Sequence, residues 1–370
     1  MTEALYKKKS LSLKFPLSQL YFYLTEGCNL CCRHCWLAPS YDPDASRYAL
    51  LDFELFQKII AEALPLGLTG VKLTGGEPLL HPDFSAFLQV LQQKKLHLVL
   101  ETNGLLCSHE IAGQVARLQN PFVCVSLDGA DAATHDSIRG VAGAFAKAKT
   151  AIGMFAAHNI NVQVIMSVMQ DNVEQVRNVT ALAEKLGAAS VKFNIIQPTG
   201  RGEAIHNGAA GLAIKDAIKL GRKVETELAA GTPLKLFFDY PAAFRSLRRL
   251  AADDDCGVCS ILSILGVLPT GEYALCGIGS HVDELVFGKA GEDSLAKVWH
   301  EHATLRVLRQ ELPGRLEGIC ARCLMKHICL GACLAQNYYR TKSLWAPFWF
   351  CQLAEQNGLF PDSRLDLPSK

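Results

Sequence analysis

The cysteines of this chain fall into two groups, and their spacing is suited to metal binding. The first group has four members within eight residues: Cys28, Cys31, Cys32 and Cys35. The second group occupies the last third of the chain: Cys256, Cys259, Cys276, Cys320, Cys323, Cys329, Cys333 and Cys351. Only Cys107 and Cys124 lie between the groups. Clustered cysteines in a compartment that keeps thiols reduced indicate metal ligands rather than disulfides or scattered packed thiols.

The first group contains the spacing Cys28-x3-Cys32-x2-Cys35. Three thiolates on one short loop can bind three irons of a [4Fe–4S] cube and leave the fourth iron open to a small chelating ligand. Zinc is the alternative, but zinc loops usually pair two C-x2-C units. No partner pair lies nearby, so the pattern favours iron and sulfur, with Cys31 as a free or packed thiol.

Polar residues follow the next three predicted strands. Gly75-Gly76-Glu77 comes first, and its glycines would let the backbone approach a ligand closely while Glu77 accepts from an ammonium group. Asn103 and Ser126 follow at the ends of the next two strands, and Arg139 lies further along. Each of these could also belong to an ordinary turn or a solvated surface.

Strand-like and helix-like segments alternate up to about residue 200. Strands are predicted at 20–25, 70–74, 96–101, 122–127, 161–168 and 190–196, and helices at 51–64, 82–94, 108–118, 142–157 and 173–186. This order implies parallel strands with right-handed crossovers. The polar motifs all fall at the ends of strands one to four, so we expect an α/β fold with a partial (β/α)6 TIM-like barrel and the chemistry on its C-terminal face.

The organisation changes in the last third. Residues 200–211 are Gly-rich and read as a loop, and residues 212–230 as a helix that bridges to the next domain. We therefore divide the chain into an N-terminal segment (1–19), a barrel with its bridging helix (20–240), and a small cysteine-rich domain with a C-terminal tail (241–370).

The composition excludes several classes of protein. The chain has 370 residues, 49% of them apolar, and a net charge of +1, so it is too apolar to be disordered and has no basic excess for binding nucleic acid. No apolar run reaches the roughly 18 residues of a membrane helix, and the N-terminus is a poor signal peptide. We expect a cytoplasmic protein with no membrane partner.

The first cysteine loop resembles the C-x3-C-x-aromatic-C signature of the radical S-adenosylmethionine (SAM) enzymes, with His34 in the aromatic position. The resemblance spans residues 20 to about 200. It implies that SAM chelates the open iron and that Gly75, Gly76 and Glu77 hold its amino group. It also implies that Ser126 and Arg139 contact the SAM carboxylate, and that Asn103 belongs to the same site.

The second group resembles the SPASM domain, which extends radical SAM enzymes that modify peptides and proteins. The matching spacings are Cys259-x11-Gly271-x4-Cys276 and Cys320-x2-Cys323-x5-Cys329-x3-Cys333, followed by Cys351. The resemblance implies two auxiliary [4Fe–4S] clusters: Auxiliary I on Cys256, Cys259, Cys276 and Cys333, and Auxiliary II on Cys320, Cys323, Cys329 and Cys351. If Cys256 swings away, Auxiliary I has an open iron for a substrate thiolate. Two zinc ribbons and a purely electron-relaying role are the alternatives.

The resemblance implies a peptide maturase with SAM and three [4Fe–4S] clusters as cofactors. Reductive cleavage of SAM would give a 5′-deoxyadenosyl radical, which takes a hydrogen atom from a ribosomal precursor peptide. The net result would be an oxidative crosslink, a thioether or similar bond at Cys or selenocysteine. Alternatives are sulfatase-type side-chain oxidation, modification of a haem precursor or another small molecule, and an iron–sulfur electron carrier. Sulfatase-maturing members have Asp where this chain has Gly277. This difference disfavours sulfatase-type side-chain oxidation.

The implied partners are the precursor peptide and a flavodoxin- or ferredoxin-type reductant. About 19 residues precede the first strand, too few for a leader-recognition domain. Recognition of a peptide would then use the barrel, the SPASM domain or a separate leader-recognition protein. Acid–base candidates are Glu203, His206, Asp239 and Tyr240. A lone residue of this kind is more often structural, so we predict no catalytic residue among them.

Overall fold

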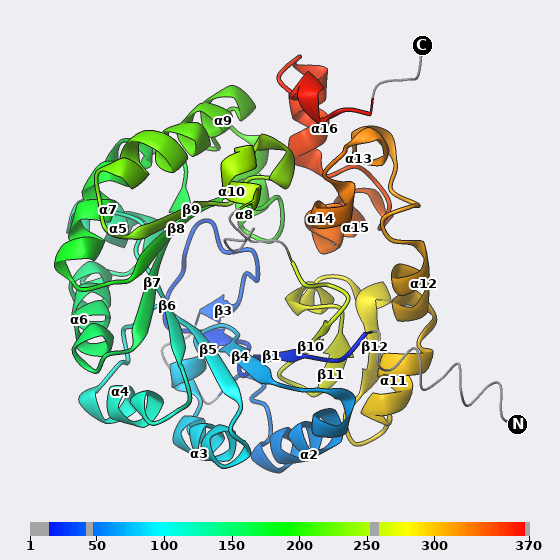
Figure 1. Ribbon diagram of the computed structural model, residues 1–370. Helices are drawn as coiled ribbons and strands as arrows, with labels where there is room; N and C mark the ends of the chain where they lie inside the picture. Colours follow the sequence, from blue (N-terminus) through cyan, green and yellow to red (C-terminus); the bar gives the residue numbers. More distant parts are fainter. Residues whose placement is uncertain (1–14, 42–46, 252–258, 367–370) are drawn as a thin grey trace, which may run out of the picture.

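The computed structural model describes residues 15–41, 47–251 and 259–366. One ten-stranded sheet curves around the centre of the molecule with helices on its outside (Figure 1). Its strands, in sheet order, are β12 (Val286–Lys289), β11 (Glu272–Ala274), β10 (Ile264–Val267), β1 (Gln19–Tyr23), β4 (Gly70–Thr74), β5 (His97–Thr102), β6 (Phe122–Ser126), β7 (Asn161–Val168), β8 (Ser190–Ile195) and β9 (Lys235–Phe238). The short strands β2 (Gly27–Cys28) and β3 (Ser40–Tyr41) pair separately.

The helices divide between the two parts of the chain. Those of the barrel are α2 (Phe53–Ala63), α3 (Phe84–Lys94), α4 (His109–Ala116), α5 (Ala132–Arg139), α6 (Ala144–Ala157), α7 (Val176–Lys185), α8 (Gly202–Asn207), α9 (Ile214–Lys223) and α10 (Leu247–Ala251). Those that follow are α11 (Leu295–Glu301), α12 (Ala303–Glu311), α13 (Gly318–Arg322), α14 (Lys326–Cys329), α15 (Leu334–Thr341) and α16 (Trp349–Gln356).

Alternation along the strands sets the two faces of the sheet. In β4, Val71 and Leu73 are fully buried in the core beneath the helices, whereas Lys72 between them is half-buried and faces the concave side. Side-chain caps fix the starts of the outer helices: Asp52 accepts from the Leu55 N–H and Ser108 from the Ile111 N–H. Such a cap contributes about 1 kcal/mol.

The α/β fold class predicted from the sequence is confirmed. All six predicted strands are present as β1 and β4 to β8, each parallel to its neighbour. The bounds predicted for β4 and β7 are those observed.

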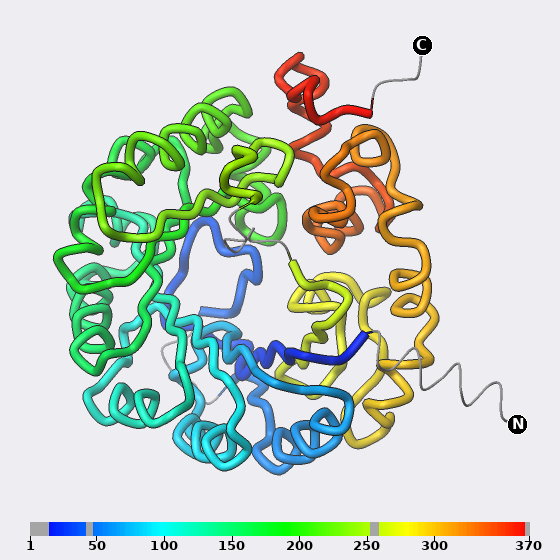
Figure 2. The backbone as a smooth tube through the Cα atoms, viewed as in Figure 1, coloured from blue at the N-terminus to red at the C-terminus, as the bar shows by residue number. Residues whose placement is uncertain are grey.

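The structure differs from the prediction after β8. The segment predicted as a loop contains the helix α8, the predicted bridging helix α9 turns into a π-helix at Val224–Leu228, and β9 adds a seventh parallel strand. Strand β10 pairs in parallel with β1, so the sheet runs from the barrel into the cysteine-rich part (Figure 2, where the blue β1 lies beside yellow β10). The proposed boundary near residue 240 therefore falls within a continuous sheet.

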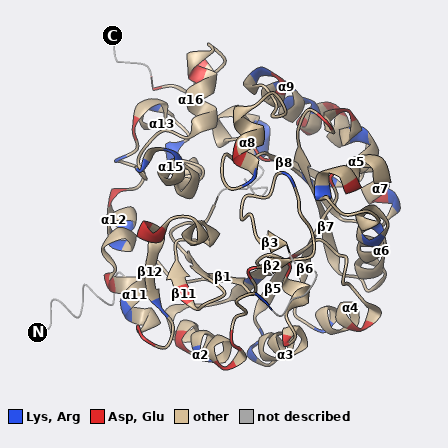
Figure 3. Cartoon of the chain, turned by 180° about the vertical axis from the view of Figure 1, so that it is seen from behind, with Lys and Arg blue, Asp and Glu red and all other residues tan. Residues whose placement is uncertain are grey.

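Lys and Arg residues and Asp and Glu residues are interspersed over the outer helices (Figure 3). In the ranges that the structure describes, no helix combines the length and the apolar character needed to cross a bilayer.

Candidate iron–sulfur sites and active site

The first cysteine loop leaves the C-terminal end of β1 and lies over the ends of the barrel strands. Cys28 and Cys32 are buried, Cys35 is half-buried, and Cys31 is exposed. The burial of the three predicted ligands and the exposure of Cys31 agree with the roles that the spacing suggests.

Two glycines allow other parts of the chain to pack directly on this loop. A Cβ at Gly76 would lie 1.8 Å from the Gly27 carbonyl oxygen, and Gly75 has a φ of +133°. A Cβ at Gly200, whose φ is +56°, would lie 2.3 Å from the Trp36 carbonyl oxygen. The sequence predicts that Gly75 and Gly76 admit a ligand, and the structure adds that Gly76 admits the cysteine loop itself.

Glu77 is 1% exposed, and both of its carboxylate oxygens accept hydrogen bonds. Oε1 accepts from the Thr102 hydroxyl at 2.6 Å and from the Leu79 N–H at 3.1 Å, and Oε2 accepts from the Asn103 N–H at 2.8 Å. Burial raises the pKa of Glu77 to about 7, although these hydrogen bonds favour the carboxylate. A fixed carboxylate of this kind is suited to an ammonium partner, which would lower that pKa.

Asn103 connects the end of β5 to the cysteine loop. Its side-chain amide donates to Asn29 Oδ1 at 2.7 Å and lies 4.0 Å from Cys28 Sγ. The sequence predicts a role in the SAM site, and the structure places the residue between Glu77 and a predicted cluster ligand.

Arg139 lies at the end of α5 and points back toward the cysteine loop. Its Nη1 donates to Cys32 Sγ at 3.6 Å, and its Nε lies 2.8 Å from Asp128 Oδ2. Asp128 is fully buried. Burial alone would raise its pKa, but Arg139 and His34 bring that pKa below the usual range. Asp128 was not predicted from the sequence, although it lies two residues after the predicted site residue Ser126.

The other two residues predicted for the SAM site lie close to this pair in sequence or space. The His34 side chain is 10% exposed with Nε2 3.6 Å from Asp128 Oδ2, and its partial burial lowers the pKa of His34 to about 4. Ser126 is half-buried at the C-terminal end of β6. The predicted SAM contacts of both residues stay predictions.

The donor set of the loop fits an iron–sulfur cluster. Burial raises the pKa of the Cys28 and Cys32 thiols, so the thiolates need a bound cation to form, and iron supplies one. Within residues 15–41, 47–251 and 259–366, no three Cys, His, Asp or Glu side chains converge as the ligands of a single metal ion do. A cube binds one thiolate at each of its corners, so its ligands stand further apart.

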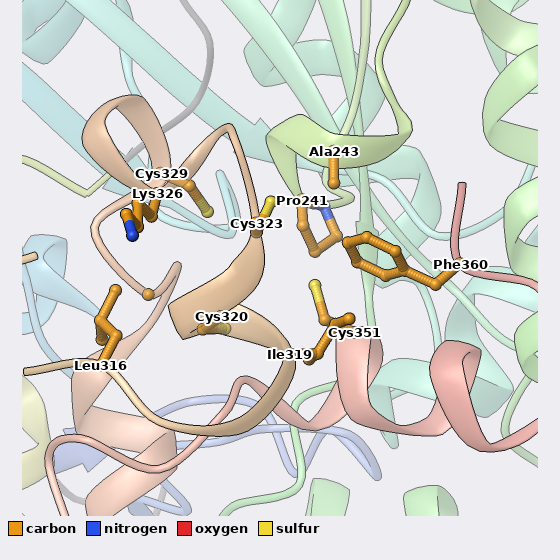
Figure 4. A pocket seen from close by; sticks show the side chains of 11 residues that line it. Pro241, Ala243, Leu316, Ile319, Cys320, Cys323, Lys326, Cys329, Cys351 and Phe360 are labelled. Carbon is orange, nitrogen blue, oxygen red and sulfur yellow. The ribbon is translucent and has the colours of Figure 1, made fainter. Parts of the chain in front are cut away.

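Four cysteines of the second group surround one cavity. Cys320, Cys323 and Cys329 come from α13, α14 and the turn between them, and Cys351 comes from α16 (Figure 4). The cavity is otherwise lined largely by apolar residues such as Ile319 and Phe360. These are the four cysteines predicted for Auxiliary II.

Backbone N–H groups donate to sulfurs of this cavity. Phe348 donates to Cys320 Sγ at 3.5 Å and Met325 to Cys323 Sγ at 3.4 Å. A further hydrogen bond between Cys320 and Cys351 lowers the pKa of Cys320 and raises that of Cys351. N–H groups aimed at sulfur stabilise thiolates and tune the potentials of iron–sulfur clusters, so this cavity also fits its predicted group.

Three of the cysteines predicted for Auxiliary I interact electrostatically. Burial, together with the neighbouring Cys333, raises the pKa of Cys259 to about 12, and the same two causes raise that of Cys276. All three are half-buried. Cys256, the predicted fourth ligand, lies outside the described residues.

Tyr23 occupies the space beside Gly277. A Cβ at Gly277 would lie 2.5 Å from the Tyr23 ring and 2.7 Å from its hydroxyl oxygen. The Tyr23 side chain is 5% exposed, and its hydroxyl accepts the Gly277 N–H. The acidic residue of sulfatase-maturing enzymes therefore has no room here without displacement of Tyr23.

The four acid–base candidates separate clearly in the structure. Glu203 accepts from the Tyr339 hydroxyl at 3.1 Å, and His206 packs edge-on against Trp349 with ring centroids 4.4 Å apart. Tyr240 is buried. Asp239 alone of the four lies on the concave side of the sheet, with Oδ1 3.8 Å from Lys192 Nζ.

Comparison with known protein families identifies two domains. The profile of the radical SAM superfamily matches residues 22–183. The profile of SPASM, an iron–sulfur cluster-binding domain, matches residues 256–324. The first match contains the first cysteine group, and the second contains five of the eight cysteines of the second group, Cys256 to Cys323.

Several curated relatives align with most of the chain. An AdoMet-dependent heme synthase of Methanosarcina barkeri is 28% identical over 338 residues, 86% of this chain and 91% of the relative. The mycofactocin maturase MftC of Mycobacterium ulcerans is 29% identical over 335 residues, 89% and 86%. AlbA of Bacillus subtilis, an antilisterial bacteriocin subtilosin biosynthesis protein, is 28% identical over 349 residues, 90% and 72%.

Solved structures share the fold. SuiB of Streptococcus suis bound to its precursor peptide SuiA superposes with a TM-score of 0.73 and 18% identity, covering 95% of this chain and 80% of that one. At this identity the likeness concerns the fold.

Proposed function

Because the chain is an enzyme of the radical SAM superfamily with a C-terminal SPASM domain, we propose that it is a peptide maturase. It would cleave SAM reductively, abstract a hydrogen atom from a ribosomal precursor peptide, and give an oxidative crosslink at Cys or selenocysteine. The observation that carries the proposal is the buried three-cysteine loop beside the fixed carboxylate of Glu77.

Each residue of the proposed SAM site has a distinct task. Cys28, Cys32 and Cys35 would hold the first [4Fe–4S] cluster, which, when bound and reduced, supplies the electron that cleaves SAM. Glu77 would bind the amino group of SAM, with Gly75 and Gly76 bringing the backbone close. Ser126 and Arg139 would orient its carboxylate while Asp128 fixes the Arg139 guanidinium. Asn103 and Arg139 would also donate to cluster sulfurs.

The proposal includes two auxiliary clusters on the cysteine sets predicted from the sequence. Auxiliary II would use the four cysteines of the cavity, and Auxiliary I would use Cys259, Cys276 and Cys333 with Cys256. They would accept one electron from the substrate radical, and this loss of an electron from the substrate makes the net reaction oxidative. A flavodoxin- or ferredoxin-type reductant, a separate leader-recognition protein and a cytoplasmic location complete the proposal.

Two kinds of observation favour a peptide substrate. The relatives include a maturase and a bacteriocin biosynthesis protein, and the fold is one that holds a precursor peptide in SuiB. The position of Tyr23 against Gly277 disfavours sulfatase-type chemistry that uses an acidic residue at 277.

The test is anaerobic reaction of the reconstituted enzyme with SAM, dithionite and each short peptide encoded beside its gene. We expect 5′-deoxyadenosine and a mass loss of about 2 Da per crosslink, since crosslinking removes two hydrogens. Formation of 5′-deoxyadenosine without mass loss on any peptide contradicts the maturase proposal. No 5′-deoxyadenosine at all would indicate an electron carrier.

Modification of a haem precursor is the second candidate, favoured by the alignment of a heme synthase with 86% of this chain. The same assay with an iron porphyrin carrying carboxylate side chains separates the two. Loss of CO2 from the porphyrin, with no change in any peptide, would select this candidate.

A further inference from the structure

Two ion pairs lie on the concave face of the sheet, within electrostatic reach of Cys259, Cys276 and Cys333. Lys72 Nζ on β4 is 2.7 Å from Glu101 Oε1 on β5, and Lys192 Nζ on β8 is 3.8 Å from Asp239 Oδ1 just after β9. All four residues alternate along the chain with core residues such as Val71 and Phe193, so their side chains share the interior of the barrel. Neither the family resemblance nor the proposed SAM site uses them.

The ion pairs remain open to a ligand. Their side chains are between 21% and 36% exposed, although a barrel interior is normally filled by apolar side chains. Lys192 also lowers the pKa of Glu101, after the larger effects of burial and Lys72. The two ion pairs are therefore close enough to influence each other electrostatically.

The ion pair between Lys192 and Asp239 leaves hydrogen-bonding capacity unused. The separation of 3.8 Å between Lys192 Nζ and Asp239 Oδ1 is too long for a good hydrogen bond. Two residues after Lys192, on the same face of β8, Asn194 carries a buried Oδ1 that has no partner within the described residues. A donor and two acceptors thus face one small region of the interior, and a group with one acceptor and one donor would pair with the donor and with one of the two acceptors.

We propose that Lys192, Asn194 and Asp239 form a binding site for a main-chain amide of an extended peptide segment inside the barrel. Lys192 donates to the peptide carbonyl oxygen, and Asp239 or Asn194 Oδ1 accepts from the peptide N–H. Lys72 and Glu101 complete the site as a neutral pair, held by the Thr74 hydroxyl on Glu101 at 3.2 Å. This inference rests on the proposed peptide maturase function and assigns residues to its substrate.

The charge balance of the site defines the chemical class of ligand. Two ammonium and two carboxylate groups cancel, so a neutral dipolar segment gains hydrogen bonds without leaving a charge unpaired. A ligand with several carboxylates would meet Glu101 and Asp239 in a region of low dielectric constant, where like charges repel strongly. The site therefore selects a peptide over a polycarboxylate tetrapyrrole.

The test uses the full-length holoenzyme and two probes. Metal-free coproporphyrin III, a tetracarboxylate, is titrated and followed by its fluorescence, and the precursor peptide identified by its 2 Da loss is used for steady-state kinetics. We expect Glu101→Gln and Asp239→Asn each to tighten porphyrin binding about 10-fold, because each frees a lysine. We expect Lys192→Met to weaken it by a similar factor.

The exposed pair Lys289–Glu292 offers a matched control. Glu292→Gln removes the same charge far from the barrel interior and should leave both measurements unchanged, whereas Asn194→Leu should raise the peptide KM about 10-fold. Retained iron content and circular dichroism check folding, and the opposite signs expected for Asp239→Asn and Lys192→Met keep the test decisive if one variant misfolds.

Unchanged porphyrin binding in Glu101→Gln, Asp239→Asn and Lys192→Met overturns the inference. An unchanged peptide KM in Asn194→Leu overturns it as well. If no peptide is processed, the proposed function fails by itself. The porphyrin titration then still decides whether these charges face a ligand.

Discussion

The two cysteine sites of this chain are built in different ways. The first takes three cysteines from one loop. Besides the Leu30 N–H of that loop, which donates to Cys28, it receives hydrogen bonds to sulfur from side chains of distant elements, Asn103 after β5 and Arg139 on α5.

The cavity of the second site takes four cysteines from α13, α14 and α16 and the turn between the first two helices. Its donors include backbone N–H groups, those of Met325 and Phe348 in the same region and that of Ala242 after β9. The first site thus recruits side chains from distant barrel elements, whereas the second relies on backbone N–H groups and also packs against the segment after β9.

This difference matches the tasks we propose. A site with three ligands needs an outside structure to shape its open position, and the barrel brings Glu77 to the cysteine loop. A site with four ligands needs only to hold and tune its group. The following predictions would break or sharpen this contrast.

The largest effect is expected when the first site loses its ligands. The triple variant Cys28→Ala, Cys32→Ala, Cys35→Ala should form no 5′-deoxyadenosine and keep roughly two-thirds of the iron, since the other two clusters would remain. Chromatography of the reaction and iron analysis measure both values. Loss of all the iron would show that the second group does not assemble independently.

A smaller change should reach the first site through the barrel. Gly76→Ala places a Cβ 1.8 Å from the Gly27 carbonyl oxygen, so the cysteine loop must move, at a cost of about 3 kcal/mol. We expect SAM cleavage to fall at least ~10-fold. Gly153→Ala on α6 is the control, because a Cβ there meets nothing within 4 Å. Equal activity in the two variants would mean that SAM cleavage does not depend on how the cysteine loop packs at the end of β4.

Removing one cavity ligand should leave the first site intact. Cys351→Ala should lower the iron content by up to about one-third while SAM cleavage without peptide stays within about twofold. Cys31→Ala, at an exposed cysteine, should change neither value. A large loss of SAM cleavage in Cys351→Ala would mean that the two sites are coupled.

The smallest effect concerns pH. Burial raises the pKa of Glu77 from 4.5 to about 7, and only its ionised form attracts the ammonium group of SAM. SAM affinity should therefore rise about fivefold between pH 6 and pH 7, with the α-amino group of SAM still protonated. Calorimetric titration measures it, and Glu77→Gln should bind weakly and without this rise. Affinity that falls over the same interval would refute the role of Glu77.

The same shift has the opposite sign for the stability of the protein without SAM. A carboxyl group whose pKa is raised on folding contributes stability fully below its unfolded value of 4.5. That contribution is lost as the pH rises through about 7. Denaturant unfolding of wild type and Glu77→Gln at pH 5 and pH 8 would show the difference.

The sequence was sufficient where a local pattern coincides with a structural period. Strands such as β4 and β7 carry buried residues at every second position, and turn residues end them, so their bounds could be predicted. The resemblance to the SPASM domain likewise implied the set of four cysteines that surrounds the cavity.

The sequence was insufficient where tertiary contacts determine structure. Helix α8 lies in a Gly-rich segment, and its residues Glu203 and His206 contact Tyr339 and Trp349 more than 130 positions later. Strand β9 has four residues and follows Pro233, so no period could be recognised. Arg139 was expected to bind a carboxylate, but its buried partner Asp128 has no signal in the sequence beyond a polar residue in a turn.

Strand β1 also sets an order of events during synthesis. Its partner on one side, β10, pairs Gln19 with Ile264, 245 residues further along. At about 5–20 residues per second, the ribosome needs roughly 12–50 s to make that stretch. During this interval one edge of β1 has no partner strand, and the cysteine loop that follows β1 is attached to an incomplete sheet. Iron delivered to the nascent chain would meet a site that is finished only when the last third has been made.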